Sequence, residues 1–247
     1  MVGVWGWQSI FLALTVFSVM AAIAVAVGLP ETFPAHQPRQ PLSGSLRRYI
    51  DLLSDRVYLG YALTGGISIA GMFAYIAGSP FVFIKLYGVP AEHYGWVFGS
   101  NAAGFILMAQ VNARLLARRG PAFLLSRTVW LYMLAALALL GVAALRTDAL
   151  WPLLVPLFIC IASLGCILPN TSACAMSGQG ARAGSASAML GCIQFGVAAG
   201  AASLVGVLHD GTAMPMAMVI SVCGVLAVTI GMSTQRLQRA RALQAQV

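Results

Sequence analysis

The sequence has few charged side chains, and acidic ones are the scarcest. Only 8% of its 247 residues are charged, with six acidic and fourteen basic side chains, while 60% are hydrophobic. A typical soluble domain is about 25% charged, so this chain cannot cover a water-facing surface of its size. These values exclude a soluble enzyme, a disordered tail and a nucleic-acid-binding domain, and they predict an integral membrane protein.

Cysteine is also scarce and does not have the spacing of a metal site. The five cysteines lie in apolar stretches, and no two of them are separated as C-x-x-C. An odd number in this setting argues against a disulfide framework and against a zinc site. We therefore expect no metal and no cofactor. A membrane-embedded enzyme is the weakest functional alternative, because the apolar stretches contain no acidic side chain and the sequence has no G-x-S-x-G motif.

Seven stretches without Asp, Glu, Lys or Arg are long enough to cross a membrane, which takes about 20 apolar residues per helix. They are 1–30, 57–84, 93–113, 128–145, 149–181, 183–209 and 211–235. The stretch 149–181 exceeds one span, and Pro169-Asn170 predicts that its helix ends near 170–176. The sequence thus predicts an all-α integral membrane protein with seven transmembrane helices.

The basic residues gather in alternate connections between these stretches. Lys85 and Arg146 lie on one side of the predicted membrane, and the other twelve lie on the opposite side, in 31–56, in 114–127, at Arg182 and in 236–247. Because cytoplasmic loops carry the excess of Lys and Arg, the N-terminus is expected outside and the C-terminus in the cytoplasm. Positive charge spread over one membrane face suits anionic lipid headgroups and does not indicate a nucleic-acid partner.

Three groups of residues, in order along the chain, resemble one transporter family. They are GLPET at 28–32; FAYIAGSPFV at 73–82 with YGV at 87–89 and HYGWVFGSN at 93–101; and LPNT at 168–171 with AGSASAMLG at 183–191 and QF at 194–195. In identity and spacing they resemble helices six to twelve of the Bcr/CflA drug-resistance transporters, which belong to the major facilitator superfamily.

The resemblance implies four parts. They are 1–30, the last helix of an N-terminal bundle; 31–56, a cytoplasmic linker; 57–235, a six-helix C-terminal bundle; and 236–247, a cytoplasmic tail. It also implies multidrug-type efflux by proton-coupled antiport in the bacterial inner membrane. The expected partners are protons, a small amphipathic drug-like substrate, the lipid bilayer and a missing N-terminal transporter half. The alternative is a truncated, non-transporting membrane remnant or an assembly subunit.

Uncharged polar and aromatic side chains are the candidate substrate-binding residues. Spacings of three and four residues place several of them on common helical faces. A cavity with aromatic and amide groups suits amphipathic ligands, whereas the alternative for each residue is a hydrogen bond between helices. The candidates are Tyr75, Ser79, Asn101, Phe105, Asn170 and Gln194.

Glycine spacing predicts close helix packing at two places. Gly95-x-x-x-Gly99 and Gly196-x-x-x-Gly200 are small-residue motifs of the kind that allow helix backbones to approach each other. If this interpretation holds, a leucine at Gly196 is more harmful than a leucine at Ala198.

Overall fold

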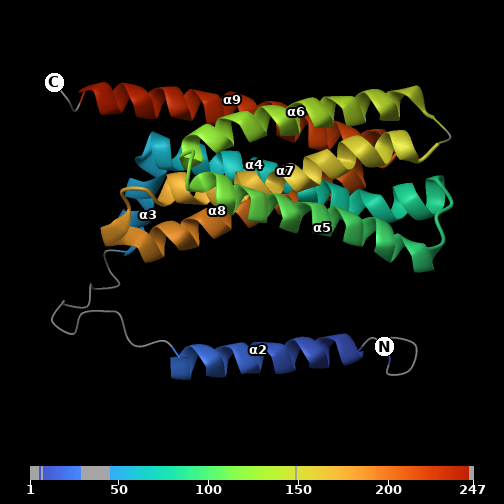
Figure 1. Ribbon diagram of the computed structural model, residues 1–247, viewed down its shortest axis with the longest axis horizontal. Helices are drawn as coiled ribbons and strands as arrows, with labels where there is room; N and C mark the ends of the chain where they lie inside the picture. The colour runs from blue at the N-terminus through green and yellow to red at the C-terminus, as the bar shows by residue number, and fades with distance from the viewer. Residues whose placement is uncertain (1–5, 7, 29–44, 148, 245–247) are drawn as a thin grey trace. The chain divides into compact units, whose positions relative to one another are not determined.

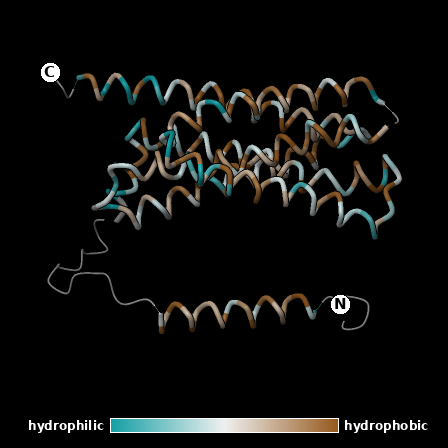
Figure 2. The backbone as a smooth tube through the Cα atoms, in the orientation of Figure 1, coloured by the Kyte–Doolittle hydropathy of each residue, from teal (hydrophilic) through white to brown (hydrophobic). Residues whose placement is uncertain are grey.

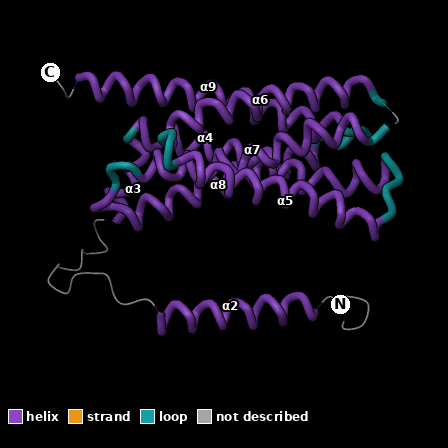
Figure 3. Tube along the Cα trace, viewed as in Figure 1, coloured by secondary structure: helices purple, strands orange, loops and turns teal. Residues whose placement is uncertain are grey.

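The computed structural model describes residues 6, 8–28, 45–147 and 149–244, which contain helices and loops and no strand (Figure 1; Figure 3). The chain divides into two compact units, Met1–Leu42 and Ser43–Val247. The described α-helices are α2 (Gln8–Gly28), α3 (Ser45–Ser54), α4 (Arg56–Pro80), α5 (Ala91–Leu116), α6 (Pro121–Leu145), α7 (Trp151–Met176), α8 (Ala183–Val207) and α9 (Met214–Gln244). A π-helix, η2 (Phe81–Leu86), follows α4, and a short 3-10 helix, η3 (Gly180–Arg182), precedes α8.

Six of the described helices are long and apolar enough to cross a membrane, namely α2, α4 together with η2, α6, α7, α8 and α9. The remaining expected span, 93–113, falls within α5, which has 26 residues. This helix is more polar, because it includes Asn101, Gln110 and Asn112. The structure thus gives six candidate spans and one long helix of mixed polarity. The predicted end of the helix near 170–176 is confirmed, since α7 ends at Met176.

The first unit contributes α2, whose residues are almost all apolar. None of its described residues is buried, and its hydropathy is the highest of the candidate spans. Figure 2 shows hydrophobic residues along the length of this helix. In contrast, the hydrophilic residues of α9 gather toward its C-terminal end. The predicted linker 31–56 falls partly outside the described residues, and its described part contains α3.

Local sequence explains how α4 begins and ends. Asp55 precedes the helix, and its carboxylate accepts a hydrogen bond from the backbone N–H of Val57, which satisfies one of the free N–H groups of the first turn. At the other end Pro80 has no N–H to donate. The backbone continues from there as the wider π-helix η2.

The six helices α4 to α9 form three layers of two helices each (Figure 1). One layer holds α6 and α9, the middle layer α4 and α7, and the third layer α5 and α8. Pairs within the first two layers pack side by side, whereas α5 and α8 pack on the middle layer and not on each other. Within the third layer, α5 therefore covers α7 and α8 covers α4.

The packing pattern shows that two three-helix repeats are interleaved. Helix α4 packs against α8 and α9, and helix α7 packs in the same way against α5 and α6. The pairs α4–α7 and α6–α9 complete the bundle. Exchanging α4, α5 and α6 with α7, α8 and α9 leaves this pattern unchanged. Each repeat thus completes its packing on the other.

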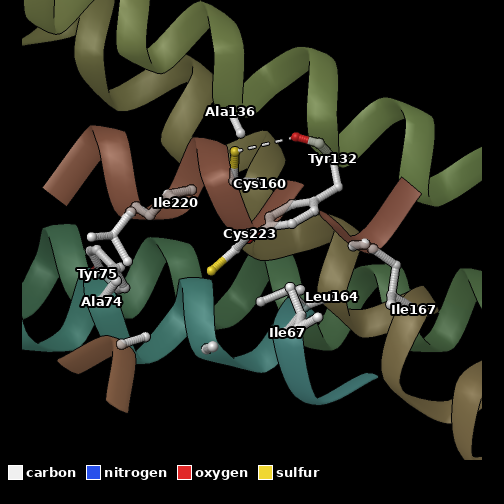
Figure 4. Close-up of a cluster of buried hydrophobic side chains, with 14 of the residues drawn as sticks. Ile67, Ala74, Tyr75, Tyr132, Ala136, Cys160, Leu164, Ile167, Ile220 and Cys223 are labelled. Carbon is white, nitrogen blue, oxygen red and sulfur yellow. Dashed lines mark hydrogen bonds between the residues drawn. The ribbon is translucent and has the colours of Figure 1, made fainter. Parts of the chain in front are cut away.

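The core of the bundle is centred on α4 and α7, and large aromatic side chains fill it. Tyr58, Tyr61, Tyr75 and Tyr132 are all at most 2% exposed. Figure 4 shows side chains of α4, α6, α7 and α9 meeting in part of this core, with the Cys160 thiol 3.8 Å from the Tyr132 carbonyl oxygen. These contacts hold the middle layer against the α6–α9 layer.

Close approaches between helices occur at other glycines than the two predicted motifs. A Cβ at Gly165 of α7 would overlap the backbone carbonyl oxygen of Phe105 in α5. A Cβ at Gly66 of α4 would lie 3.4 Å from the Cα of Gln194 in α8. These contacts join α7 to α5 and α4 to α8, so they fall at corresponding interfaces of the two repeats.

The two predicted small-residue motifs are not packing surfaces of this bundle, so that prediction is wrong here. At each of their four glycines, no described atom lies within 4 Å of the place where a Cβ would stand. Ala198, between the glycines of the second motif, is fully buried instead. Small residues do recur at this spacing in α8, but the buried face of α8 is the one that carries Ala198.

Candidate functional site

Three of the predicted site residues meet where α4 ends and α5 begins. Tyr75 and Ser79 lie one helical turn apart on α4, and Asn101 lies on the facing side of α5. The Asn101 amide nitrogen donates hydrogen bonds to the Tyr75 hydroxyl at 3.2 Å and to the Val97 carbonyl oxygen at 3.1 Å. Both Tyr75 and Asn101 are 2% exposed. The pair therefore forms a buried polar link between the two helices.

Aromatic rings surround this link. The ring of Tyr75 stacks on that of Phe98, with centroids 5.7 Å apart and an angle of 15° between the planes. The rings of Phe83 and Tyr94 lie 6.3 Å apart beside them. The hydroxyl groups of Ser79 and Tyr94 are 2.8 Å apart and share a hydrogen bond. We call these residues the Tyr75 cluster: Tyr75, Ser79, Phe83, Tyr94, Phe98 and Asn101.

One acceptor in the Tyr75 cluster is unused. The side-chain oxygen of Asn101 is buried and has no hydrogen-bond partner in the described part of the chain. An unpaired buried acceptor costs about 1–3 kcal/mol relative to a satisfied one. The oxygen is enclosed by protein atoms, so another molecule does not reach it in this conformation.

Asn101 also lines a pocket between α5 and α7. The pocket has a volume of about 440 Å³, within the range of about 300–1,000 Å³ that is usual for small-molecule sites. We call it the α5–α7 pocket, and it is lined by Trp96, Val97, Ser100, Asn101, Trp151, Leu154, Val155, Phe158 and Ile159. Its walls are therefore mainly aromatic and aliphatic, with Ser100 and Asn101 as the polar groups.

Asn170 lies in a separate group of polar side chains, which joins α5, α6 and α7. Its amide nitrogen donates to the side-chain oxygen of Asn112 at 2.7 Å and to the carbonyl oxygen of Cys166 at 2.8 Å. Thr128 of α6 lies 3.1 Å from the Cys166 sulfur. In the structure these contacts hold helices together, and Asn170 does not line the α5–α7 pocket.

The other two candidates, Phe105 and Gln194, are placed away from the pocket. Phe105 is half-buried and packs against the core, and its backbone meets Gly165. Gln194 is half-buried on α8, and its amide nitrogen lies close to Gly65 of α4. The structure therefore brings Tyr75, Ser79 and Asn101 together and leaves the remaining three at other helix contacts.

Sequence reasoning missed the aromatic wall of the α5–α7 pocket. Trp151, Val155 and Phe158 follow the spacing of four and three residues that defines one helical face, so that face could have been recognised. The sequence does not indicate that α5 rather than another helix lies beside it. Trp96, one turn before Ser100, was missed for the same reason.

Charged groups meet at the opposite end of the bundle. Arg241 of α9 donates to Asp55 at 3.0 Å, and Gln179 donates to the other carboxylate oxygen at 3.3 Å. Burial raises the pKa of Asp55, but the hydrogen bonds from Arg241 and from the Val57 backbone lower it by more, so the pKa lies below its ordinary value. This contact ties the start of α4 to the end of α9.

Among the described residues, no three His, Cys, Asp or Glu side chains are placed to hold a metal ion together.

The bundle and its long apolar helices define a multi-pass membrane protein. Sequence comparison assigns the family: the profile of the Major Facilitator Superfamily matches residues 1–203. The chain belongs to this superfamily of transporters, whose members are generally not enzymes. The interleaved repeats agree, because each half of such a transporter contains two three-helix repeats.

Several relatives carry names that bear on function. The chain is 34% identical over 222 residues to the uncharacterized MFS-type transporter YdgK of Bacillus subtilis, covering 89% of this chain and 54% of that protein. It is 28% identical over 224 residues to the bicyclomycin resistance protein homolog of Haemophilus influenzae, covering 90% and 56%. It is 27% identical over 117 residues to the multidrug transporter MdfA of Edwardsiella ictaluri, covering 46% and 28%. The chain thus spans about half the length of the first two relatives.

Proposed function

We propose that this chain is the second half, with the helix before it, of a proton-coupled multidrug exporter. The observation that carries the proposal is a six-helix bundle of two interleaved repeats, in a chain that spans about half of a relative named for bicyclomycin resistance. Transporters of this superfamily move substrates by rocking one half against the other around a site near the middle of the membrane. The chain supplies one of these halves.

Under this proposal α5 crosses the membrane as a seventh span. It is as long as the candidate spans and packs along α7, one of the two central helices. Its amides at Asn101 and Asn112 are buried at 2% and 3% exposure, so they do not face lipid. With α5 counted, the helices of 57–235 cross alternately, and the basic loops fall on the cytoplasmic side.

The proton carrier is expected in the other half. The described acidic residues of the bundle lie at helix ends or in connections: Asp51, Asp55, Glu92 and Asp210. A carrier that binds and releases a proton during antiport needs a titratable group in the membrane interior. Supplying an N-terminal half is therefore necessary for coupled export.

Efflux from cells that lack their own drug exporters tests this function. The chain is expressed alone, and also together with an N-terminal half built from the Haemophilus influenzae relative. We expect bicyclomycin resistance and uncoupler-sensitive efflux from the pair and neither from the chain alone. Export by the chain alone would contradict the proposal. So would a folded, membrane-inserted pair that exports none of a panel of drugs.

Labelling of introduced cysteines tests the orientation. In a Cys192→Ser background, Arg118→Cys should resist a membrane-impermeant maleimide in intact cells, while Lys85→Cys should react. The physical reason is the excess of basic residues on the loops that include Arg118. Labelling of Arg118→Cys from outside would reverse the proposed orientation.

A further inference from the structure

One face of α6 is exposed along its length. This helix lies in an outer layer of the bundle with α9 (Figure 1), and its Leu125 and Tyr132, on the inner side, are each 1% exposed. Together with Arg127, the large apolar residues of the outer side follow spacings of four and three residues, which place them in one line. We call these apolar residues the α6 stripe: Phe123, Trp130, Leu134 and Leu137, all between 42% and 59% exposed. Because α6 is long and apolar enough to cross a membrane, the stripe suits contact with lipid acyl chains.

Two arginines converge at the start of this stripe. The guanidinium carbon of Arg119 lies 5.1 Å from the centroid of the Phe123 ring, and that of Arg127 lies 5.7 Å from the same centroid. Contacts of this kind between a cation and an aromatic ring are attractive. The Phe123 ring thus holds two positive charges beside the first residue of the α6 stripe.

No carboxylate balances these two charges in the described part of the chain. The ion pairs found there, Arg182 with Asp51 and Arg241 with Asp55, involve neither arginine. Two like charges held at one ring repel each other, so an anion beside them is stabilised. Guanidinium groups present several N–H donors in a planar fork, which matches the oxygen atoms of a phosphate.

The neighbouring helix adds further positive charge. The side-chain amide of Gln235 in α9 donates a hydrogen bond to the carbonyl oxygen of Ala122 at 2.8 Å, so the last part of α9 lies beside the start of α6. From residue 235 to residue 244, α9 contains arginines and no acidic residue. These surroundings strengthen the attraction of an external anion to this end of α6.

We propose that Arg119 and Arg127 bind the headgroup of an anionic phospholipid whose acyl chain lies along the α6 stripe. Such a lipid combines the two chemistries that meet here, a phosphate beside the guanidinium groups and hydrocarbon along Trp130 and Leu134. A free phosphate would contact only the arginines, and a lipid without net charge would leave their repulsion uncompensated. The site goes beyond the proposed export function and does not depend on it.

Quenching of Trp130 fluorescence by brominated lipid measures occupancy of this site. Trp130 lies about 10 Å from Phe123 along the helix axis, within the roughly 15 Å of hydrocarbon in one leaflet. The purified chain, with phenylalanine in place of every other tryptophan, is placed in phosphatidylcholine vesicles. These contain a small fraction of either phosphatidylglycerol or phosphatidylcholine with the same dibrominated chains.

We expect the brominated phosphatidylglycerol to reach half-maximal quenching at a mole fraction at least about fivefold lower than the brominated phosphatidylcholine. This is the attraction expected of one or more basic residues near an anionic headgroup. Equal quenching by the two lipids would overturn the proposal. Weak quenching by both would show that another protein surface covers the stripe, and would overturn it as well.

A pair of matched variants locates the charge that attracts the lipid. Arg127→Gln removes one charge at the stripe, and Arg47→Gln makes the same change at an exposed position of α3, which packs on α4 and α8. We expect Arg127→Gln to reduce the preference for phosphatidylglycerol at least twofold, Arg119→Gln/Arg127→Gln to abolish it and Arg47→Gln to leave it unchanged. Equal losses in Arg127→Gln and Arg47→Gln would assign the preference to overall charge and overturn the site. The three arginines are exposed, so these variants should fold as the parent does.

Two further measurements separate this site from other sources of the signal. A chain with Trp96 as its only tryptophan reports from an exposed position on α5, one turn after Glu92, and should show no preference for phosphatidylglycerol. A preference there equal to that at Trp130 would overturn the proposal. Inorganic phosphate, compared with chloride at equal ionic strength, should not relieve the quenching of Trp130. Relief by phosphate would show that the arginines bind a free anion, and would also overturn the lipid site.

Discussion

The hydroxyl of Tyr132 in α6 occupies the space beside Gly71 of α4 where a larger residue would carry its Cβ. Tyr132 is 1% exposed, and its hydroxyl has no hydrogen-bond partner among the described residues. Figure 4 shows the Tyr132 side chain among the core residues of the neighbouring helices. Close packing, and not a hydrogen bond, therefore holds the Tyr132 side chain against Gly71.

This contact predicts that substitutions at Gly71 and at Tyr132 have different effects on stability. Gly71→Ala should destabilise the bundle by about 1–3 kcal/mol, as overpacking of a core does. Tyr132→Phe should be neutral or stabilising, because it removes an unpaired buried hydroxyl. The double variant should be less destabilised than Gly71→Ala, since the nearest remaining ring atom lies 3.3 Å from the new Cβ. Thermal unfolding of the purified protein in detergent measures all three, and an unchanged Tm for Gly71→Ala would contradict the fit.

The Asn112–Asn170 contact predicts coupling between α5 and α7. Asn112→Leu removes the acceptor 2.7 Å from the Asn170 amide and should cost about 1–3 kcal/mol. The double variant Asn112→Leu/Asn170→Leu should lose less than the sum of the two single changes, because neither amide is then left unpaired. Additive losses in unfolding measurements would show that the two residues act separately.

The Asp55–Arg241 contact predicts a pH-dependent contribution to stability. Because the pKa of Asp55 is lowered in the folded protein from its ordinary value of 3.8, its contribution is present above that value. The contribution is lost as the pH falls through the lower, folded pKa. Asp55→Asn keeps a good helix cap and should cost no more than about 1 kcal/mol at pH 7, since the pair is partly exposed.

The Tm difference between Asp55→Asn and the parent should therefore shrink as the pH is lowered through this range. Asp51→Asn is the matched control, because Asp51 and its partner Arg182 are 3.9 Å apart and largely exposed. Its Tm should match the parent at each pH. If the Tm of Asp55→Asn stayed below that of the parent by the same amount down to pH 3, the loss of stability would not come from the charge of Asp55.

The orientation of α8 predicts that Ala198 is more sensitive than Gly196. Ala198 is fully buried, so Ala198→Leu should force neighbouring helices apart at a cost of about 1–3 kcal/mol. Gly196 has open space around its Cα, so Gly196→Leu should leave the thermal stability of the chain nearly unchanged. Equal Tm losses for the two variants would contradict the observed packing of α8.

Sequence patterns predict where the helices lie better than they predict which helices pack against each other. Hydropathy places α7 correctly because it depends on local composition, and the helix end at Met176 lies within the predicted range, although the helix continues through Pro169. The spacing of Tyr75 and Ser79 defines a face of α4, but only the folded bundle brings Asn101 to that face. The pairing of α7 with α5, which creates the pocket at Trp151 and Phe158, arises from long-range packing and leaves no local pattern. The glycine motif at 196–200 shows the same limit, since small residues suit a helix contact without indicating that one is made.

The interleaving of the two repeats has a consequence for biosynthesis. Two of the main neighbours of helix α4, namely α8 and α9, leave the ribosome only after the whole of α5, α6 and α7. At about 5–20 residues per second, this interval is on the order of ten seconds. During that time the small and polar residues of α4 that later meet α8 and α9 must be covered by lipid, by α5 or by the insertion machinery. A chain whose translation stops after α6 thus presents an incomplete surface to cellular quality control.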